Sequence, residues 1–344
     1  MKILRVGDPH VTVSNLEESN KLMEFIVKTA REREVNRIEF LGDLFDTHAV
    51  IRSEVLQFWT KWFRILGGFD GDETFQVVVI VGNHDQVGSK EKEGYIHALT
   101  PFKEFTTQRH NHERNLIIID VPTLLPHNNG TSGYIAYIPH ISGVESFLQS
   151  ANNLKAADIN NKATHAVCHQ TFLGATYENG IFAEDGIDIN LVPFDHIVSG
   201  HIHKSQTIGK CFYPGTARYM KSTDANQKKG VWIFEDWEAK EFISTEEVVT
   251  PMYTLVVTEP EEVPELNPRA KTVLELHGSS QWISKVKKQL KNKASIRSFP
   301  TDRKAPKTDA SRLETVEDYA TGFTFNSGVT KTEVVSYLRG LNDN

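Results

Sequence analysis

The chain has 344 residues and a formal net charge of -7, with 39% hydrophobic and 24% charged residues. This composition excludes a disordered chain, and no apolar run approaches the roughly 20 residues that span a bilayer. The first residues, Met1 to Val6, have no signal-peptide pattern, and two cysteines are too few for a disulfide framework or a cysteine-built zinc site. We expect a soluble cytoplasmic protein of a bacterial or virus-infected cell, with no membrane partner.

Short apolar runs that end at a small residue and a polar cluster recur along the first two thirds of the chain. They are Lys2–Val6, Arg37–Leu41, Val77–Val81, Thr164–Val167 and His196–Ser199. Continuous apolar runs of this length predict buried strands. Between the early runs, apolar residues at three- and four-residue spacing predict helices over Leu16–Arg33 and Ser53–Leu66. The alternation predicts an α/β fold in which helices cover the sheet, with functional residues at the strand ends.

The character of the chain changes after residue 250. Strands are predicted at Thr254–Val257 and Thr272–Leu276, followed by a basic helix at Gln281–Lys291. The stretch Phe299–Thr315 has two prolines and mixed charges, which predicts the start of a linker. We therefore divide the chain into an α/β domain at 1–250, a smaller basic domain at 251–300, a linker at 301–329 and an amphipathic helix at 330–344.

The segment from Arg269 to Lys304 contains ten basic residues and two acidic ones, a net charge of +8 that leaves -15 for the remainder. Such asymmetry suggests a polyanion-binding module on an acidic body. Phosphate contacts from this module would release counterions from a nucleic-acid backbone. The alternative is a solvated charged helix. The candidate DNA-binding residues are Lys285, Lys287, Lys288, Lys291, Lys293 and Arg297.

Seven polar residues at the strand ends are candidate metal ligands: Asp8, His10, Asp43, Asn83, His169, His201 and His203. Mixed carboxylate, amide and imidazole ligands suit Mn²⁺, Fe²⁺ or Zn²⁺ better than Ca²⁺. Seven ligands exceed the needs of one ion and suit two ions about 3.5–4 Å apart, a spacing used in phosphoester hydrolysis. Nine further histidines, His48 and His140 among them, are interpreted as core or surface residues.

The ordered set Asp8-x-His10, Gly42-Asp43-x-x-Asp46, Gly82-Asn83-His84-Asp85, His169 and Gly200-His201-x-His203 resembles the calcineurin-like metallophosphoesterase superfamily. Further motifs resemble the SbcD-type nuclease subunit of double-strand-break repair complexes: His169-Gln170, Gly200-His201-Ile202-His203-Lys204 and Tyr213-Pro214-Gly215-Thr216-Ala217-Arg218. The resemblance covers residues 1 to about 235. It implies a two-sheet sandwich flanked by helices, a small α+β capping domain and a C-terminal helical tail.

The resemblance also implies roles. One metal would be held by Asp8, His10, Asp43 and His203, and the second by Asp43, Asn83, His169 and His201, so that Asp43 bridges. The expected ions are two Mn²⁺, with Mg²⁺ or Fe²⁺ as alternatives. His84 is the expected catalytic histidine, with Asp85 orienting its ring. Asp46 would hold a histidine or cap the following helix. His140, where relatives carry an aromatic residue, is expected at the surface or in the substrate wall, without touching the ligands.

The leading hypothesis is a Mn²⁺-dependent DNA exonuclease and endonuclease, the nuclease subunit of an SbcCD-like repair and recombination complex. Its rivals are a phosphomonoesterase or cyclic-nucleotide phosphodiesterase, and a DNA-end-binding scaffold. The terminal helix either folds back on the body or inserts its apolar face into an SbcC-type coiled-coil ATPase. A homodimer is expected through residues 48–66, where Trp59, Trp62 and Phe63 offer apolar area. Core packing explains these three side chains equally well.

Overall fold

The computed structural model describes residues 1–302 apart from 49, 69–75, 88–95, 106–115, 128–132, 161, 236 and 291–292. The greater part of the predicted linker and the predicted helix at 330–344 lie outside the described residues, as does Lys291. Contacts between Cα atoms divide the chain into two units. The first comprises Met1–Thr254 and Leu266–Val273, and the second Leu255–Glu265 and Leu274–Asn344.

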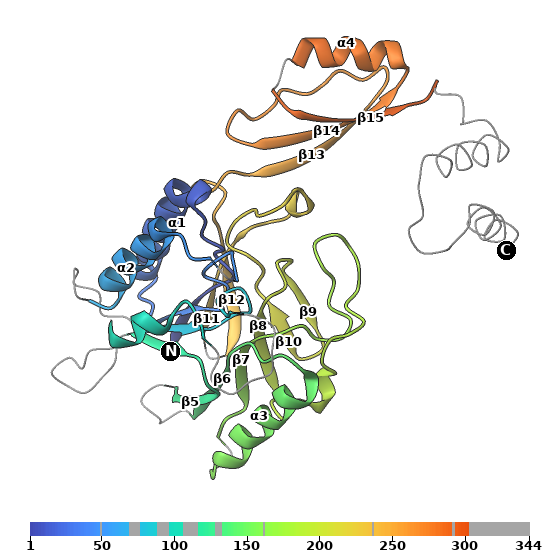
Figure 1. Cartoon of the computed structure of the whole chain (residues 1–344). Helices are drawn as coiled ribbons and strands as arrows, with labels where there is room; N and C mark the ends of the chain where they lie inside the picture. The colour runs from blue at the N-terminus through green and yellow to red at the C-terminus, as the bar shows by residue number, and fades with distance from the viewer. Residues whose placement is uncertain are drawn as a thin grey trace, which may run out of the picture. The chain divides into compact units, whose positions relative to one another are not determined.

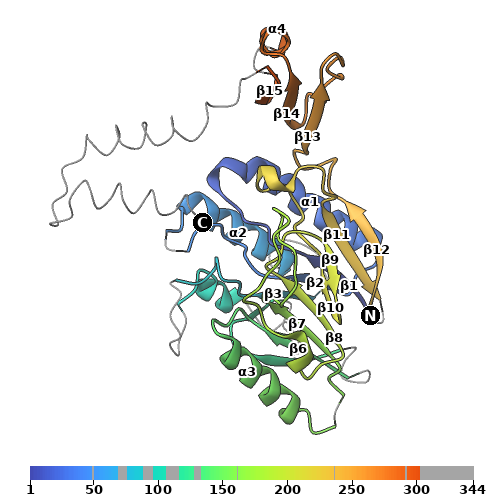
Figure 2. The same ribbon diagram turned by 90° about the vertical axis from the view of Figure 1, so that its right-hand side faces the viewer.

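The first unit contains two six-stranded sheets (Figures 1 and 2). One sheet has the order β12 (Glu238–Ser244), β11 (Gly230–Glu235), β1 (Lys2–Val6), β2 (Arg37–Phe40), β3 (Gln76–Ile80) and β4 (Leu116–Ile119). The four strands from β1 to β4 are parallel, and β11 and β12 add antiparallel partners at one edge. The β-branched residues that fill β1 to β4 suit strands buried on both faces, which accounts for their continuous apolar runs.

The other sheet has the order β5 (Thr123–Pro126), β6 (Tyr134–Ile138), β7 (His165–His169), β8 (His196–Gly200), β10 (Cys211–Tyr213) and β9 (Gln206–Ile208). Strands β6, β7, β8 and β10 are parallel, and β5 and β9 are antiparallel edges. Between the two sheets lies one apolar cluster, which includes Leu41, Val78, Tyr137 and Val167.

Helices cover the outer faces of both sheets. Helices α1 (Leu16–Glu32) and α2 (Ser53–Leu66) pack with the first sheet in one core cluster, and α3 (Val144–Ala157) packs with the second sheet in another (Figure 2). Short 3-10 helices lie at Val13–Asn15, Thr100–Phe105, Ile189–Leu191 and Ser222–Asp224. The predicted α/β class, a two-sheet sandwich flanked by helices, is confirmed.

A buried polar network connects the two sheets. The guanidinium of Arg5 on β1 donates to the carboxylate of Glu39 on β2 at 2.7 Å, and the hydroxyl of Tyr137 on β6 donates to the same carboxylate. Arg37 in turn donates to the Tyr137 hydroxyl at 2.9 Å. All four side chains are buried, so each charge depends on its partners rather than on water.

The second unit contains a helix and most of a three-stranded sheet. The strands are β13 (Met252–Thr258), β14 (Lys271–Gly278) and β15 (Ser295–Pro300), in that order, and α4 (Ser280–Leu290) contacts β15. The prediction that a linker starts at Phe299 is wrong, because Phe299 lies in β15 and its ring stacks on His277 of β14 at 4.5 Å. The charges and prolines of this stretch predict a linker, but its first residues form a strand because they pair with β14.

The predicted apolar dimer face on α2 is not available at the surface. Trp59 and Phe63 are fully buried and Trp62 is 4% exposed, all three within the core of the first sheet. Core packing therefore explains these three side chains. A homodimer stays a prediction, but these side chains do not provide its interface. Among the helices in the described part of the chain, none is both long and apolar enough to cross a membrane.

Candidate metal centre

The seven predicted ligand residues converge from both sheets. Asp8 and His10 follow β1, Asp43 follows β2, and Asn83 follows β3; in the second sheet His169 ends β7, and His201 and His203 follow β8. Carboxyl ends of parallel strands meet at one edge of a sheet. Because the two sheets pack face to face, the two edges bring all these side chains to one place.

The backbone turns sharply at these strand ends. Positive φ angles occur at Asp8 (+32°), His10 (+42°), Asp43 (+50°) and His201 (+79°). Left-handed backbone costs a non-glycine residue about 1–2 kcal/mol and persists where the surrounding structure enforces it, which is typical of functional sites. Gly42 has a φ of +109°, and a Cβ there would lie 2.3 Å from Nδ1 of His169, so only glycine fits.

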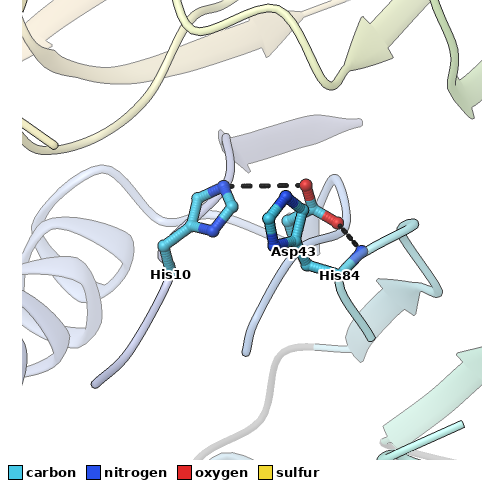
Figure 3. A group of neighbouring side chains, drawn as sticks. All are labelled: His10, Asp43 and His84. Atoms are coloured by element: carbon cyan, nitrogen blue, oxygen red, sulfur yellow. Dashed lines mark hydrogen bonds and ion pairs between the residues drawn. The ribbon is translucent and has the colours of Figure 1, made fainter. Parts of the chain in front are cut away.

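One half of the centre is formed by His10, Asp43 and His203. Nε2 of His10 lies 3.6 Å from Oδ2 of Asp43 and 3.2 Å from Nε2 of His203. Figure 3 shows the Asp43 carboxylate between His10 and His84, with one oxygen toward the His10 ring and the other accepting the His84 backbone N–H at 2.8 Å. Ligand atoms of His10, Asp43 and His84 lie within 4.8 Å of one another, close enough to hold an ion.

The other half is formed by Asp43, Asn83, His169 and His201. Nε2 of His169 lies 3.2 Å from Oδ2 of Asp43 and 3.0 Å from Oδ1 of Asn83. Nδ1 of His201 lies 2.8 Å from the same Asn83 oxygen. Oδ2 of Asp43 is thus the oxygen that faces both halves, which is the position that a bridging carboxylate requires.

The hydrogen-bond pattern of His169 fits a cation at its Nε2. Its Nδ1 lies 2.7 Å from the backbone carbonyl of Leu41, and a carbonyl only accepts, so Nδ1 carries the proton. In the neutral ring Nε2 then presents a lone pair to the oxygens of Asp43 and Asn83. Acceptors that face one another need a cation or a proton between them, and a histidine whose other nitrogen is bonded to a carbonyl is the usual metal ligand.

Two further histidines show the same orientation. Nδ1 of His10 lies 3.3 Å from the Asp46 carboxylate, and Nδ1 of His203 lies 3.6 Å from Glu178, while both Nε2 atoms face the centre. Oδ2 of Asp8 accepts the backbone N–H of His201 at 2.8 Å. Its buried Oδ1 lies 3.8 Å from Nδ1 of His169 and has no hydrogen-bond partner. A buried carboxylate oxygen without a donor also fits a cation.

Charges within the centre shift one another's pKa values. Burial works to raise the pKa of Asp43, but His169 and His10 outweigh it and hold that pKa well below its usual range. Burial works to lower the pKa of His169, yet Asp43 and Asp8 raise it to about 9. At Asp8 burial dominates and raises the pKa to about 6. Without an ion, a proton on His169 balances the Asp43 charge; metal binding would displace that proton.

The catalytic candidate His84 is held by Asp46 rather than by Asp85. Nδ1 of His84 donates to the Asp46 carbonyl at 2.7 Å, which leaves Nε2 for proton transfer. The prediction that Asp85 orients this ring is wrong: its carboxylate accepts the backbone N–H groups of Phe45 at 3.0 Å and Gly82 at 2.9 Å, and so joins two loops of the site. Asp46 holds two histidines, since its carboxylate also faces His10. It does not cap α2, which begins at Ser53.

Comparison with known families agrees with this geometry. Residues 1–205 match the model of the family described as calcineurin-like phosphoesterase, which is more than half of the chain. The chain belongs to the calcineurin-like phosphoesterase family. Members of this family are metal-dependent hydrolases of phosphoesters that use divalent ions, and the residues that converge here are candidates to hold such ions.

Curated relatives of this phosphoesterase come from viruses. Over 222 residues it is 28% identical to "Putative phosphoesterase 244L" of Invertebrate iridescent virus 6, covering 62% of this chain and 69% of that one. It is 25% identical to "Putative phosphoesterase 078R" of Invertebrate iridescent virus 3, covering 63% of this chain and 57% of that one, little more than half of the relative. A solved structure described as "GAP50 the anchor in the inner membrane complex of Plasmodium" is 12% identical with a TM-score of 0.42, and the match covers 89% of this chain and 99% of that one. That TM-score carries no argument about function.

A large pocket of the phosphoesterase opens at one half of the centre. Its volume is about 980 Å³, and His10, Asp46, His84 and His203 line it. The second half, with Asn83, His169 and His201, does not line the pocket. Substrate in this pocket therefore meets the His10 and His203 side of the centre and the ring of His84.

Three residues at the site were not found from the sequence. The carboxylate of Glu178 accepts the backbone N–H of His203 at 2.9 Å. Glu178 lies in an irregular segment that has no strand-end signal in the sequence. His48 stacks on His84 at 4.2 Å, and its position two residues after Asp46 was the available signal. His140 is not a surface residue remote from the ligands: its Nδ1 lies 3.2 Å from the His169 carbonyl, and its ring stacks on His201 at 6.0 Å.

The predicted DNA-binding residues lie in the second unit. Lys285, Lys287 and Lys288 are exposed on α4, while Ile283 and Val286 of the same helix are buried. Lys293 and Arg297 are also exposed, and Arg297 pairs with Glu275 at 3.1 Å. Their DNA contacts stay a prediction.

Proposed function

We propose that this phosphoesterase is a Mn²⁺-dependent DNA nuclease that hydrolyses phosphodiester bonds at DNA ends, and that it is the nuclease subunit of an SbcCD-like complex. The single observation that carries the substrate class is the pocket at the centre. Its volume of about 980 Å³ lies at the upper end of the roughly 300–1,000 Å³ typical of small-molecule sites. A phosphomonoester would leave most of this space unused, whereas a strand of nucleotides would fill it.

The charges of the pocket wall also favour a chain of phosphates. Five cationic residues that are not candidate metal ligands line it, together with four acidic ones: Lys21, Arg218, Lys221, Arg269 and Lys271, with Glu17, Glu18, Asp46 and Glu247. Two of them are paired with acidic neighbours, Lys21 with Glu17 and Arg218 with Glu18. In the described part of the chain, no ion pair involves Lys221 or Lys271, so their charge is available to a ligand in the pocket. A nucleic-acid backbone supplies anions at regular spacing for such residues.

The residues of the centre divide the work. When bound, two divalent ions would supply an activated water and screen the charge of the phosphate. The oxygens of Asp8, Asp43 and Asn83 and the ring nitrogens of His10, His169, His201 and His203 would hold the ions in place. His84 has its Nδ1 proton committed to the Asp46 carbonyl, so Nε2 is the nitrogen left for the substrate. This nitrogen would take up a proton from solvent before it gives one to the departing sugar oxygen or, as part of a cation, stabilises the phosphate charge.

The exposed lysines of α4 support binding to duplex DNA beyond the pocket. They carry no interleaved aromatic residues, so backbone contacts with little sequence preference are proposed. An SbcC-type ATPase is the proposed partner, docked through the helix at 330–344, which lies outside the described residues. Deleting residues 258–344 would spare a phosphomonoesterase or cyclic-nucleotide phosphodiesterase and would cripple a nuclease.

The test is release of label from 5′- and 3′-labelled linear duplex DNA with Mn²⁺, with Mg²⁺ and with a chelator. The proposal expects Mn²⁺-dependent release that is lost in the Asp43→Ala variant, while that variant still binds DNA. Brisk hydrolysis of p-nitrophenyl phosphate without any cleavage of DNA, with or without the ATPase, would favour the phosphomonoesterase. DNA binding with no hydrolysis of any phosphoester would favour the scaffold.

A further inference from the structure

The loop Gly215–Arg218 is fixed against both sides of the metal centre. The N–H of Thr216 donates to the carbonyl of His203 at 3.1 Å, and the N–H of Ala217 donates to the carbonyl of Gly7, next to Asp8, at 3.2 Å. Gly215 has a φ of +77°, and a Cβ there would lie 2.9 Å from the His203 carbonyl. Backbone packing this close allows little relative movement, so Arg218 stands at a set position beside the ligands.

Arg218 is a buried cation in the wall of the pocket. It is 6% exposed, and it lines the same pocket as His10, His84 and His203. Its guanidinium reaches α1, donating to the Ser19 hydroxyl at 3.1 Å and pairing with Glu18 at 2.7 Å. These contacts use Nη1 and Nη2, and its buried Nε has no hydrogen-bond partner. A guanidinium has five N–H donors, so donors remain for a ligand in the pocket.

A second cation lies three residues further along the chain. Lys221 is exposed and lines the same pocket. Arg218 and Lys221 share this lining with Asp46, whose carboxylate lies 3.3 Å from Nδ1 of His10. His10 and His84 line this pocket as well, so the two cations share it with one half of the metal centre.

We propose that Arg218 and Lys221 form a second phosphate subsite, which binds the substrate phosphate one nucleoside away from the phosphate at the metal centre. The subsite rests on the proposed function, because a nucleotide chain carries a second phosphate one nucleoside away from the one that is cleaved. Arginine suits it because its planar fork matches two phosphate oxygens at once, while its Glu18 contact holds the fork in place. The subsite would make the enzyme prefer a phosphate-flanked diester to a simple one.

The test is calorimetric titration of the full chain with thymidine 3′,5′-bisphosphate and, separately, with thymidine 3′-monophosphate and 5′-monophosphate. Two phosphates one nucleoside apart fill both subsites, so the bisphosphate should bind about tenfold more tightly than either monophosphate, as one charge-assisted bidentate contact allows. Arg218→Lys and Lys221→Gln should each remove most of that advantage and leave monophosphate binding at the metal centre unchanged.

The controls separate a ligand contact from a structural one. Arg33→Lys is the matched variant, because Arg33 also pairs with a glutamate, Glu241 at 2.8 Å, outside the pocket; it should keep the full bisphosphate advantage. Lys221→Gln changes an exposed side chain and leaves the buried pair intact. Equal weakening of all three ligands would assign Arg218 a purely structural role and overturn the subsite, as would a bisphosphate that binds no better than a monophosphate.

This measurement needs no turnover, so it is independent of the nuclease assay. A bisphosphate advantage that depends on Arg218, in a protein that cleaves no DNA, would retain the subsite and reject DNA as the substrate. Cleavage of DNA together with no bisphosphate advantage would retain the nuclease and reject the subsite.

Discussion

Nδ1 of His84 donates a hydrogen bond to the backbone carbonyl of Asp46 at 2.7 Å. The bond places the proton of the neutral His84 ring on Nδ1 and leaves Nε2 for the substrate in the pocket. Half-burial lowers the pKa of His84, so the ring is neutral around pH 7 until it gains a proton during the reaction. The Asp46 carbonyl thus sets the tautomer of His84, a role that a carboxylate has in other histidine pairs.

Replacing His84 should therefore remove catalysis and leave the metal ligands in place. We expect His84→Ser to lower kcat by about 10²- to 10⁴-fold, the usual contribution of a positioned proton donor. His84→Asn keeps a donor for the Asp46 carbonyl and should lose as much activity, because the proton-transferring nitrogen is gone. Hydrolysis of bis(p-nitrophenyl) phosphate and metal content would be measured together. A kcat within threefold of the wild type in both variants would contradict this assignment.

Glu178 should act on metal binding through His203. Its carboxylate accepts the backbone N–H of His203 at 2.9 Å and lies 3.6 Å from Nδ1 of the His203 ring, the nitrogen on the far side from the centre. Loss of such a partner typically weakens metal binding about 10- to 100-fold, and we expect this for Glu178→Ala in a Mn²⁺ titration. Glu184→Ala, an exposed glutamate of the same segment, is the matched control and should bind Mn²⁺ as the wild type does. Equal affinities of the two variants would refute the prediction.

The buried carboxylate of Glu39 should be essential for stability. Removing it leaves Arg5 without its partner in the space between the sheets, and breaking a buried pair from one side costs about 3–5 kcal/mol. We expect Glu39→Leu to lower the free energy of unfolding by about that amount in urea denaturation. Removing both partners in Arg5→Met/Glu39→Leu should recover much of the loss. A double variant as unstable as the sum of both single changes would argue against this account.

His165 should make the folded state sensitive to acid. Burial and the neighbouring His196 lower the pKa of His165 to about 3, below the value of about 6.5 that an unfolded histidine has. Between these values the unfolded chain binds a proton that the folded chain does not, so stability falls as the pH drops below about 6.5. The slope for one such group is at most about 1.4 kcal/mol per pH unit.

The variant His165→Phe keeps a ring to stack on Trp237, which lies 3.7 Å from His165 between ring centroids, and removes the titration. The difference in unfolding free energy between wild type and variant should therefore grow in favour of the variant from pH 6.5 downward. Chemical denaturation at a series of pH values measures it. A difference that does not change with pH would rule out His165 as the source.

Particular residues show what the sequence by itself determined. The strand ends at Asp8, Asp43, Asn83, His169 and His201 could be predicted because a continuous apolar run followed by a polar cluster is a local signal, and a parallel sheet carries each cluster to the same edge. The α/β class and the ends of α2 followed from the same periodicity. These properties depend on neighbours along the chain, which the sequence displays directly.

The tertiary structure decided how those residues are held. Asp85 stands next to His84 in sequence but bonds to the backbone of Phe45 and Gly82, whereas Asp46, 38 residues earlier, orients the His84 ring. Glu178, His48 and Arg218 reach the site from loops whose course is set by long-range packing, and Phe299 is a strand residue because β14 lies beside it. Hydrogen bonds form between groups that are close in space. The course of a loop is not encoded in a local periodicity of the sequence, so these partners could not be predicted from it.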